Sequence, residues 1–250
     1  MASGRREQLA ECIYHVTCRG NLRAPIFLAD DDRARFLGLV ERACHRDGLI
    51  CHAYCLMGNH YHLLVETPQA NIGKAMHRIN SGYVQWFNLR HVSEGHLFER
   101  RYRSWIMRGR ERQMEALRYI VRNPVRAGLC STPDEWPWSS HAATVGMRAR
   151  PPFLTVDTVH RWFGSEPDAA SLYRSYVDAG VDEPHERPAL EAIIARGTSG
   201  EMATANQIYG YSLREIGAVV GLSAATVSRR LRDETLATGA DVSGPGATEP

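Results

Sequence analysis

Two histidines stand one residue apart in the apolar run CLMGNHYHLLVET, residues 55–67. Side chains alternate along a β-strand, so His60 and His62 are predicted to share one face while Tyr61 points to the other. Two imidazoles rooted about 6–7 Å apart on one face can converge on a single metal ion. The pair is a weak signal by itself, because two solvent-facing histidines on a one-sided sheet give the same pattern.

A second candidate cluster lies in ERQMEALRYIVRNPVRAG, residues 111–128, which is predicted to be helical. Tyr119 and Asn123 are four residues apart and therefore share one helical face. An adjacent stripe at the same spacing could contact phosphate and consists of Arg118, Arg122 and Arg126. The alternative is a tyrosine packed in the core beside a solvated arginine stripe.

The preceding segment, GHLFERRYRSWIMRGR (95–110), interleaves aromatic residues with arginines. Surfaces that bind single-stranded nucleic acid combine arginines, which contact the backbone, with aromatic rings, on which the bases stack. The candidate DNA contacts are Arg100, Arg101 and Arg103, together with Arg19 and Asn21 in the earlier run CRGN. An edge strand protected by charge also fits this composition.

The elements that must position these residues are predicted from hydrophobic periodicity and turn residues. Strands are expected at 12–20, on both sides of a Gly58–Asn59 hairpin turn, and at 101–109. Helices are expected at 30–48, 71–91 and 111–128, and the Pro/Trp-rich segment 131–140 is expected to wrap onto the domain. The order β–α–β–β–α–β–α predicts an α+β domain with a ferredoxin-like antiparallel sheet and helices on one face.

The last part of the chain is predicted to form a separate small all-α module. The expected boundaries are 10–145 for the first domain, 146–185 for a helical extension with a linker, 186–235 for the module and 236–250 for a disordered tail. SLREIGAVVGLSAATVSRRLRD (212–233) indicates a helix, a turn at Gly221 and a second helix. This favours a DNA-binding helix-turn-helix over a plain helical hairpin. Its candidate DNA contacts are Ser223, Thr226, Ser228, Arg229 and Arg230.

Charge is unevenly distributed along the 250 residues. Residues 1–130 contain 20 Lys and Arg against 12 Asp and Glu, whereas residues 131–250 contain 10 against 16. A basic first half suits a polyanion such as nucleic acid, although a GC-rich genome would also favour arginine. The sequence begins without an apolar leader and has no run long enough for a membrane span, so a soluble, cytoplasmic, nucleoid-associated protein is expected.

The six cysteines are scattered through apolar surroundings. Cys51 and Cys55 lie near the two histidines in the sequence, so a zinc site with these histidines is one interpretation. On one strand, however, their side chains would be rooted about 13 Å apart, too far to share a tetrahedral ion. Reduced thiols in the core are therefore favoured.

Five motifs follow one another between about residues 14 and 141: YHVTCRGN, AYCLMGNHYHLLVE, GHLFERRYRS, RYIVRNPVRAGL and WPWSS. In this order they resemble the single-tyrosine HUH transposases (Y1 transposases), most closely the REP-associated tyrosine transposase group. The resemblance implies that His60, His62 and Asn123 are metal ligands and that Tyr119 is the nucleophile. Tyr61 replaces an aliphatic residue of the family motif, but its side chain is expected to point away from the metal.

The resemblance implies an endonuclease for DNA transposition and recombination that acts on single-stranded or hairpin-forming DNA. A phenol with a pKa of about 10 is a poor nucleophile at neutral pH. The implied cofactor, Mg²⁺ or Mn²⁺, would polarise the scissile phosphate, so that Tyr119 forms a 5′-phosphotyrosine link and leaves a free 3′-OH. Two imidazoles favour Mn²⁺ over Mg²⁺, and zinc stays open from ligand type.

No membrane and no small-molecule cofactor are expected, and the protein is expected to act as a monomer or homodimer. Two other functions stay open at this point. One is a catalytically idle DNA-binding regulator, which would need none of the four site residues. The other is a metal-dependent phosphodiesterase in which water attacks and Tyr119 is structural.

Overall fold

The computed structural model describes residues 8–164, 168–180, 190–207, 211 and 213–237. It contains two compact units, residues 1–183 and 184–250, and each is described by itself. The predicted linker around 181–188 lies outside the described residues, and so does the predicted tail (236–250) apart from residues 236 and 237, which are helical and not part of a disordered tail.

The first unit is built on a four-stranded antiparallel sheet in the order β2-β3-β1-β4. The strands are β1 Cys12–Arg19, β2 Ile50–Leu56, β3 His60–Thr67 and β4 Arg103–Ile106. Helices α1 (Asp30–Asp47) and α2 (Ile72–His91) make the two crossovers, which gives the predicted ferredoxin-like α+β topology. The predicted hairpin turn joins β2 to β3, and the Met57 N–H donates to the His60 carbonyl across it at 2.9 Å.

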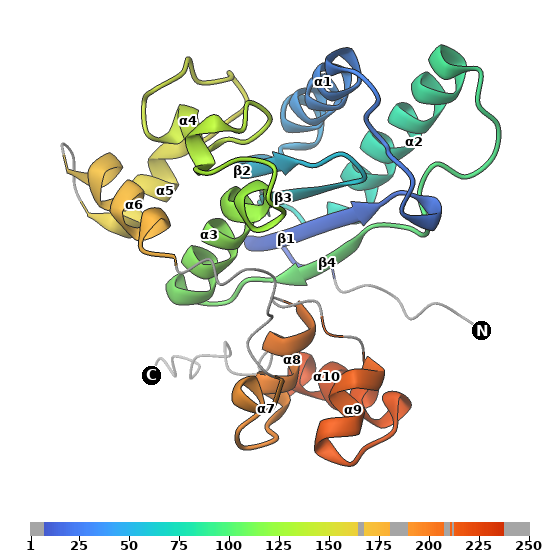
Figure 1. Ribbon diagram of the computed structural model, residues 1–250, viewed down its shortest axis with the longest axis vertical. Helices are drawn as coiled ribbons and strands as arrows, with labels where there is room; N and C mark the ends of the chain where they lie inside the picture. Colours follow the sequence, from blue (N-terminus) through green and yellow to red (C-terminus); the bar gives the residue numbers. More distant parts are fainter. Residues whose placement is uncertain (1–7, 165–167, 181–189, 208–210, 212, 238–250) are drawn as a thin grey trace, which may run out of the picture. The chain divides into compact units, whose positions relative to one another are not determined.

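One face of the sheet is covered by α1 and α2 (Figure 1). Alternate strand residues such as Val16 and Leu63 point to this face and form the larger hydrophobic core with the two helices. Tyr61 also points there, and its hydroxyl donates to the Asn80 side chain on α2 at 2.8 Å. The predicted direction of Tyr61, away from the neighbouring histidines, is therefore confirmed.

The opposite face carries α3 (Arg110–Arg126), so the expectation of helices on one face holds for α1 and α2 but is wrong for α3. Cys55 and Leu64 point from the strands to α3 and pack with Leu117 and Ile120 in a second core. Helices α5 (Val156–Phe163) and α6 (Ala169–Asp178) extend this core. The physical reason is that these strands present apolar side chains on both faces, and both faces must be covered.

The Pro/Trp-rich segment wraps along the outer edge of β2, as predicted. It contains the short helix η2 (Pro133–Glu135) and is followed directly by α4 (His141–Thr144). The Leu56 N–H donates to the Trp138 carbonyl at 2.9 Å, and the Trp136 indole N–H donates to the Leu56 carbonyl at 3.1 Å. These bonds satisfy edge groups that would otherwise be free to pair with another strand.

Cys51 and Cys55 are buried on opposite faces of the sheet, the first in the core under α1 and α2 and the second in the core under α3. Burial raises the pKa of both thiols well above the ordinary range. The two residues are therefore core thiols, and the prediction against a shared zinc site is confirmed for this pair.

The second unit contains α7 (Leu190–Ile193), α8 (Ser199–Gln207), α9 (Leu213–Val220) and α10 (Ala224–Ala237). Met202, Ile216 and Val227 are buried in its core. Gly221 follows α9 with a φ of 67°, in the left-handed region that favours glycine. Ser223 caps α10, because its Oγ accepts a hydrogen bond from the Thr226 N–H at 3.1 Å.

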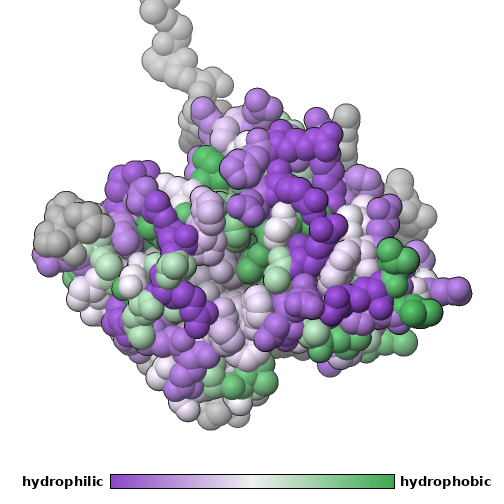
Figure 2. Space-filling view, turned by 90° about the horizontal axis from the view of Figure 1, so that it is seen from above, coloured by the Kyte–Doolittle hydropathy of each residue, from purple (hydrophilic) through white to green (hydrophobic). Residues whose placement is uncertain are grey.

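Within the described ranges, no helix combines the length and apolar character needed to cross a bilayer. Figure 2 shows a face of the molecule that is mostly hydrophilic, with hydrophobic residues in separate patches. Among the residues that the structure describes, the most exposed large hydrophobic side chains are Leu22, Leu89 and Val92, at 91%, 83% and 94% of their surface.

Candidate active site

His60 and His62 lie side by side on the α3 face of β3, with their ring centroids 5.0 Å apart. His60 is half-buried, whereas His62 is buried and its Nε2 has no hydrogen-bond partner. Buried polar atoms are nearly always paired, so an unpartnered ring nitrogen needs an explanation. A metal ligand before its metal binds presents such a nitrogen.

The side chain of Tyr119 extends from α3 toward the two histidines. Its ring is edge-on to His62, with centroids 5.5 Å apart and an interplanar angle of 90°. The Arg126 guanidinium lies over the Tyr119 ring, 5.1 Å from the centroid. The fold therefore brings the candidate nucleophile against one candidate metal ligand and places a cation beside it.

The side chain of Asn123, one helical turn after Tyr119, lies close enough to His60 to influence its pKa. Burial and the nearby charge of Arg19 lower the pKa of His60 to about 4, and the Asn123 contact offsets only part of this. Burial also lowers the pKa of His62 well below its ordinary value. Both imidazoles are therefore neutral at neutral pH, the form that binds metal ions.

Two neutral imidazoles and an amide oxygen fit a divalent cation such as Mn²⁺ or Mg²⁺. Among the described residues, no three His, Cys, Asp or Glu side chains group in a way that could hold a metal. Asn123 as a third ligand beside His60 and His62 stays a prediction from the family resemblance, and the unpaired Nε2 of His62 would be available to such an ion.

His15 on β1 belongs to this cluster but was not among the candidates predicted from the sequence. It is buried, and its Nε2 lies 2.9 Å from the Nδ1 of His62. Burial lowers the pKa of His15 to about 4, so it is neutral as well. Strand alternation places His15 on one face with Thr17 and Arg19. The register of β1 against β3, which brings it to His62, could not be read from the sequence.

Arg19 and Arg103 lie beside the cluster, on the α3 face of the sheet. Arg19 is directly opposite His60 in the β1–β3 pair, and Arg103 is opposite Thr17 in the β1–β4 pair. Burial, followed by the charge of Arg100, lowers the pKa of the Arg103 guanidinium, which shows how closely the cations gather. Positive charge at this edge attracts a phosphodiester toward the histidines.

The other predicted contacts of the first unit lie farther along this edge. Arg100, Arg101 and Asn21 are exposed, and Arg100 forms an ion pair with Glu99. The Asn21 N–H donates to the Leu97 carbonyl at 2.9 Å, which ties the loop after β1 to the arginine-rich segment.

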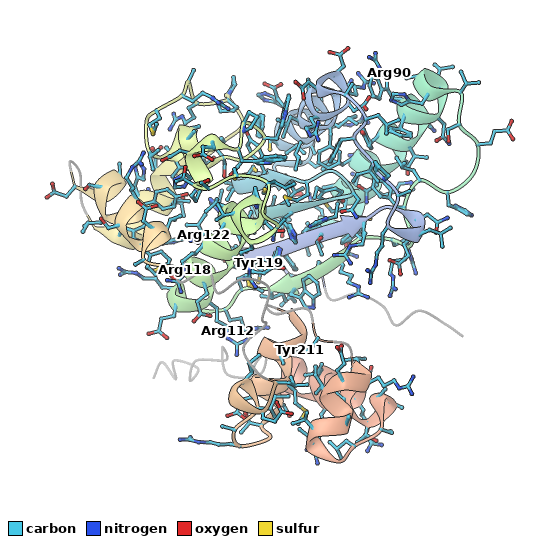
Figure 3. The ribbon with its side chains drawn as sticks, in the orientation of Figure 1. Arg90, Arg112, Arg118, Tyr119, Arg122 and Tyr211 are labelled. Carbon is cyan, nitrogen blue, oxygen red and sulfur yellow. The ribbon has the colours of Figure 1, made fainter. Side chains whose placement is uncertain are left out.

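Arg118 and Arg122 project from α3 on the side of α6, whereas Tyr119 faces the strands (Figure 3). The Arg118 guanidinium lies 4.4 Å from the Tyr176 ring centroid, and Arg122 Nη1 donates to the Val177 carbonyl at 2.6 Å. Two members of the predicted phosphate-binding stripe therefore make packing contacts, which helical spacing alone could not indicate. Their contact with DNA stays a prediction.

In the second unit the predicted DNA contacts lie at the start of α10. Ser223, Arg229 and Arg230 are exposed, and Thr226 and Ser228 are half-buried. A Cβ on Gly217 would stand 2.3 Å from the Leu222 carbonyl oxygen, so only glycine permits this close approach between α9 and the turn.

A ferredoxin-like sheet that carries two histidines opposite a helical tyrosine is the arrangement that the resemblance to the Y1 transposases implied. Residues 8–123 match the family described as Transposase IS200 like. The recognition based on the sequence motifs is thus confirmed.

Among solved structures, the chain is similar to the one described as the structure of the REP-associated tyrosine transposase bound to a REP hairpin. The TM-score is 0.51 at 16% identity, covering 63% of this chain and 93% of that chain. At this identity the likeness concerns the fold. The comparison with curated proteins gives no match.

Proposed function

We propose that the protein is a metal-dependent transposase-type enzyme that cleaves and rejoins single-stranded DNA through a 5′-phosphotyrosine intermediate on Tyr119. The observation that carries this proposal is the edge-on contact of Tyr119 with His62, whose Nε2 is buried and unpartnered. The family match supports a transposase-type activity on DNA.

Hairpin-containing DNA is the proposed substrate class. The solved structure to which the fold is similar is bound to a REP hairpin, which supports this choice. The cationic edge formed by Arg19 and Arg103 beside the histidines also supports a polyanionic substrate.

In the proposed reaction, Tyr119 Oη forms a bond to phosphorus and the bond from phosphorus to the 3′ oxygen breaks. The phenol loses its proton to water, and the leaving 3′ oxygen takes one up. A divalent ion held by His60, His62 and Asn123 would stabilise charge on the scissile phosphate. Because one phosphodiester bond replaces another, rejoining the strand needs no external energy source.

The decisive experiment uses a labelled hairpin oligonucleotide with single-stranded flanks, incubated with Mn²⁺ and separated on a denaturing gel. A covalent protein–DNA band is expected for the wild type and for Tyr176→Phe, and no band for Tyr119→Phe. Cleavage without an adduct that persists in Tyr119→Phe would identify a hydrolase that uses water. Binding without cleavage would identify a regulator.

The second unit is proposed to bind duplex DNA through α10 as a helix-turn-helix. The turn at Gly221, the Ser223 cap and the exposed Arg229 and Arg230 support this role. Such a module would select the DNA site at which the first unit acts.

A further inference from the structure

Each of the two histidines among the candidate metal ligands has one ring nitrogen held by a neighbouring side chain. For His60 the neighbour is Asn59, whose Nδ2 donates to the Arg23 carbonyl at 3.1 Å and whose Oδ1 lies 2.7 Å from His60 Nδ1. A carbonyl oxygen can only accept, so the amide must turn its own oxygen toward His60. His60 Nδ1 then carries the proton, and the lone pair is on Nε2.

For His62 the neighbour is His15, at 2.9 Å between His15 Nε2 and His62 Nδ1. If His15 were the donor, His62 would carry its proton on Nε2, where a buried N–H would have no acceptor. Orphaned buried N–H groups are rare because their desolvation is not compensated. The opposite direction, in which His62 Nδ1 donates to His15, leaves a lone pair on Nε2.

We propose that Asn59 and His15 are positioning residues that fix both His60 and His62 in the Nδ1–H tautomer, so that both Nε2 lone pairs serve one cation. Metal-binding histidines commonly donate their second ring N–H to such a partner. The use of that cation in DNA cleavage rests on the proposed function, but the tautomers are properties of the metal-free protein.

The test combines ¹⁵N NMR of the histidine rings in metal-free protein with Mn²⁺ titration followed by electron paramagnetic resonance. The wild type should show Nδ1–H at both positions. Asn59→Leu and His15→Phe remove the partner, so the affected ring should shift toward the Nε2–H form and Mn²⁺ affinity should fall on the order of 10–100-fold. His15→Gln keeps an acceptor and should retain affinity close to that of the wild type.

An Nε2–H tautomer at either position in the wild type would overturn the proposal, and so would unchanged Mn²⁺ affinity in both Asn59→Leu and His15→Phe. The ¹⁵N NMR spectrum of the wild type tests the two tautomers even if one of these variants does not fold. Neither readout depends on cleavage, so absence of the Tyr119 adduct would refute the proposed function separately.

A second and independent feature is the turn η1 (Asn21–Arg23), which presents Leu22 to solvent with 91% of its surface exposed. Leu22 and Arg23 both have left-handed backbones, with φ of 51° and 60°, a conformation that is unfavourable for residues other than glycine. Val92 has a similar backbone and exposure, but it is the C-cap of α2 and helix termination accounts for it. Leu22 lies between β1 and α1, where no α-helix ends.

This turn is fastened to two segments beside the histidine cluster. The Asn21 N–H donates to the Leu97 carbonyl, and Asn59 holds the Arg23 carbonyl. These bonds fix Leu22 in an exposed position between β3, which carries His60, and the arginine-rich segment. The turn and the segments joined to it carry four exposed cations, Arg19, Arg23, Arg100 and Arg101.

We infer that Leu22 is a wedge that stacks on the last base pair of a DNA hairpin, where the duplex opens into the single strand that enters the site. Apolar side chains serve as such wedges at base steps, and the surrounding arginines suit the flanking phosphates. The inference rests on the proposed hairpin substrate and names the part of it that this turn contacts.

Fluorescence anisotropy in EDTA tests the wedge with a tailed hairpin and with its tail alone. Leu22→Asn keeps a residue that tolerates the left-handed backbone and removes the apolar side chain. It should weaken hairpin binding about tenfold, the equivalent of burying one leucine, and leave tail binding unchanged. Val92→Asn, the matched control, should alter neither.

A 2-aminopurine placed in the terminal pair should change its fluorescence with the wild type but not with Leu22→Asn. Equal loss of hairpin and tail binding, or no loss at all, would refute the wedge. Since EDTA prevents metal-dependent cleavage, this result is independent of the Tyr119 adduct.

Discussion

The Tyr119 ring stands edge-on to the His62 imidazole, with the two centroids 5.5 Å apart. The tyrosine comes from α3 and the histidine from β3, so the packing of α3 on the sheet sets this separation. Leu64, Leu117 and Ile120 make that packing in the second core. Substitutions in this second core should therefore change the separation of Tyr119 and His62, whereas substitutions in the core under α1 and α2 should act mainly on stability.

Removal of the divalent ion should abolish cleavage and spare DNA binding. EDTA is expected to lower the cleavage rate on the order of 100-fold or more, because several kcal/mol of charge stabilisation at the phosphate are lost. Added Mn²⁺ should restore the wild type but not His62→Ala. Gel-based cleavage assays and anisotropy with the same hairpin measure both quantities, and restoration of His62→Ala by Mn²⁺ would contradict the ligand assignment.

Gly20→Ala should destabilise the first unit by about 2 kcal/mol or more. A Cβ at this position would stand 2.1 Å from the Ala24 carbonyl oxygen and 2.9 Å from Ile26 Cγ2. The matched control is Gly38→Ala in the middle of α1, where nothing lies within 4 Å. That change should stabilise by roughly 0.5–1 kcal/mol. Urea unfolding of both variants measures the two changes in the free energy of unfolding. Equal changes would show that the structure around Gly20 shifts to accommodate the new Cβ.

The stability of the first unit should fall as pH decreases below about 6.5. Burial lowers the pKa of His141 to about 4. The unfolded chain therefore takes up this proton first, and the free energy of unfolding decreases between pH 6.5 and about 4, by roughly 2–3 kcal/mol for this group. The groups that face it are Tyr173, Asp134, Asp178, Arg174 and Arg122.

His141→Gln removes this titration, so its deficit relative to the wild type should shrink as the pH falls. Denaturant unfolding at pH 7 and at pH 5 measures the difference. Parallel pH profiles for the two proteins would assign the acid sensitivity to other groups.

Arg229→Ala should weaken binding of duplex DNA and reduce the slope of log affinity against log salt by about 1, as expected for one lost phosphate contact. Arg214→Ala, an exposed arginine on α9, is the matched control and should leave both unchanged. Cleavage of the single-stranded hairpin should be the same in both variants. An equal loss in the two would indicate non-specific attraction in place of a recognition helix.

Local patterns were sufficient for features that lie within one element. Strand alternation gave the shared face of His60 and His62, and helical spacing gave that of Tyr119 and Asn123. The turn at Gly58–Asn59 and the order of strands and helices followed in the same way. Each of these depends on a few neighbouring residues.

Features that depend on contacts between distant segments were not predictable from the sequence. His15 reaches His62 only through the register of β1 against β3, and Arg122 reaches Val177 only through the docking of α6. The side of the sheet taken by α3 is a further example, because both faces of the central strands are apolar. Asn59 was recognised as a turn residue, but its second role needs the position of Arg23.

The order of the site residues along the chain also determines when, during synthesis, the proposed site can be complete. Both histidines lie on the β2–β3 hairpin, whereas Tyr119 follows β4 and reaches them only once α3 has packed on the sheet. During synthesis the histidine pair is complete before the nucleophile has been made. If Tyr119 is the nucleophile as proposed, a nascent or truncated chain that stops before α3 would lack the residue needed to join itself to a strand.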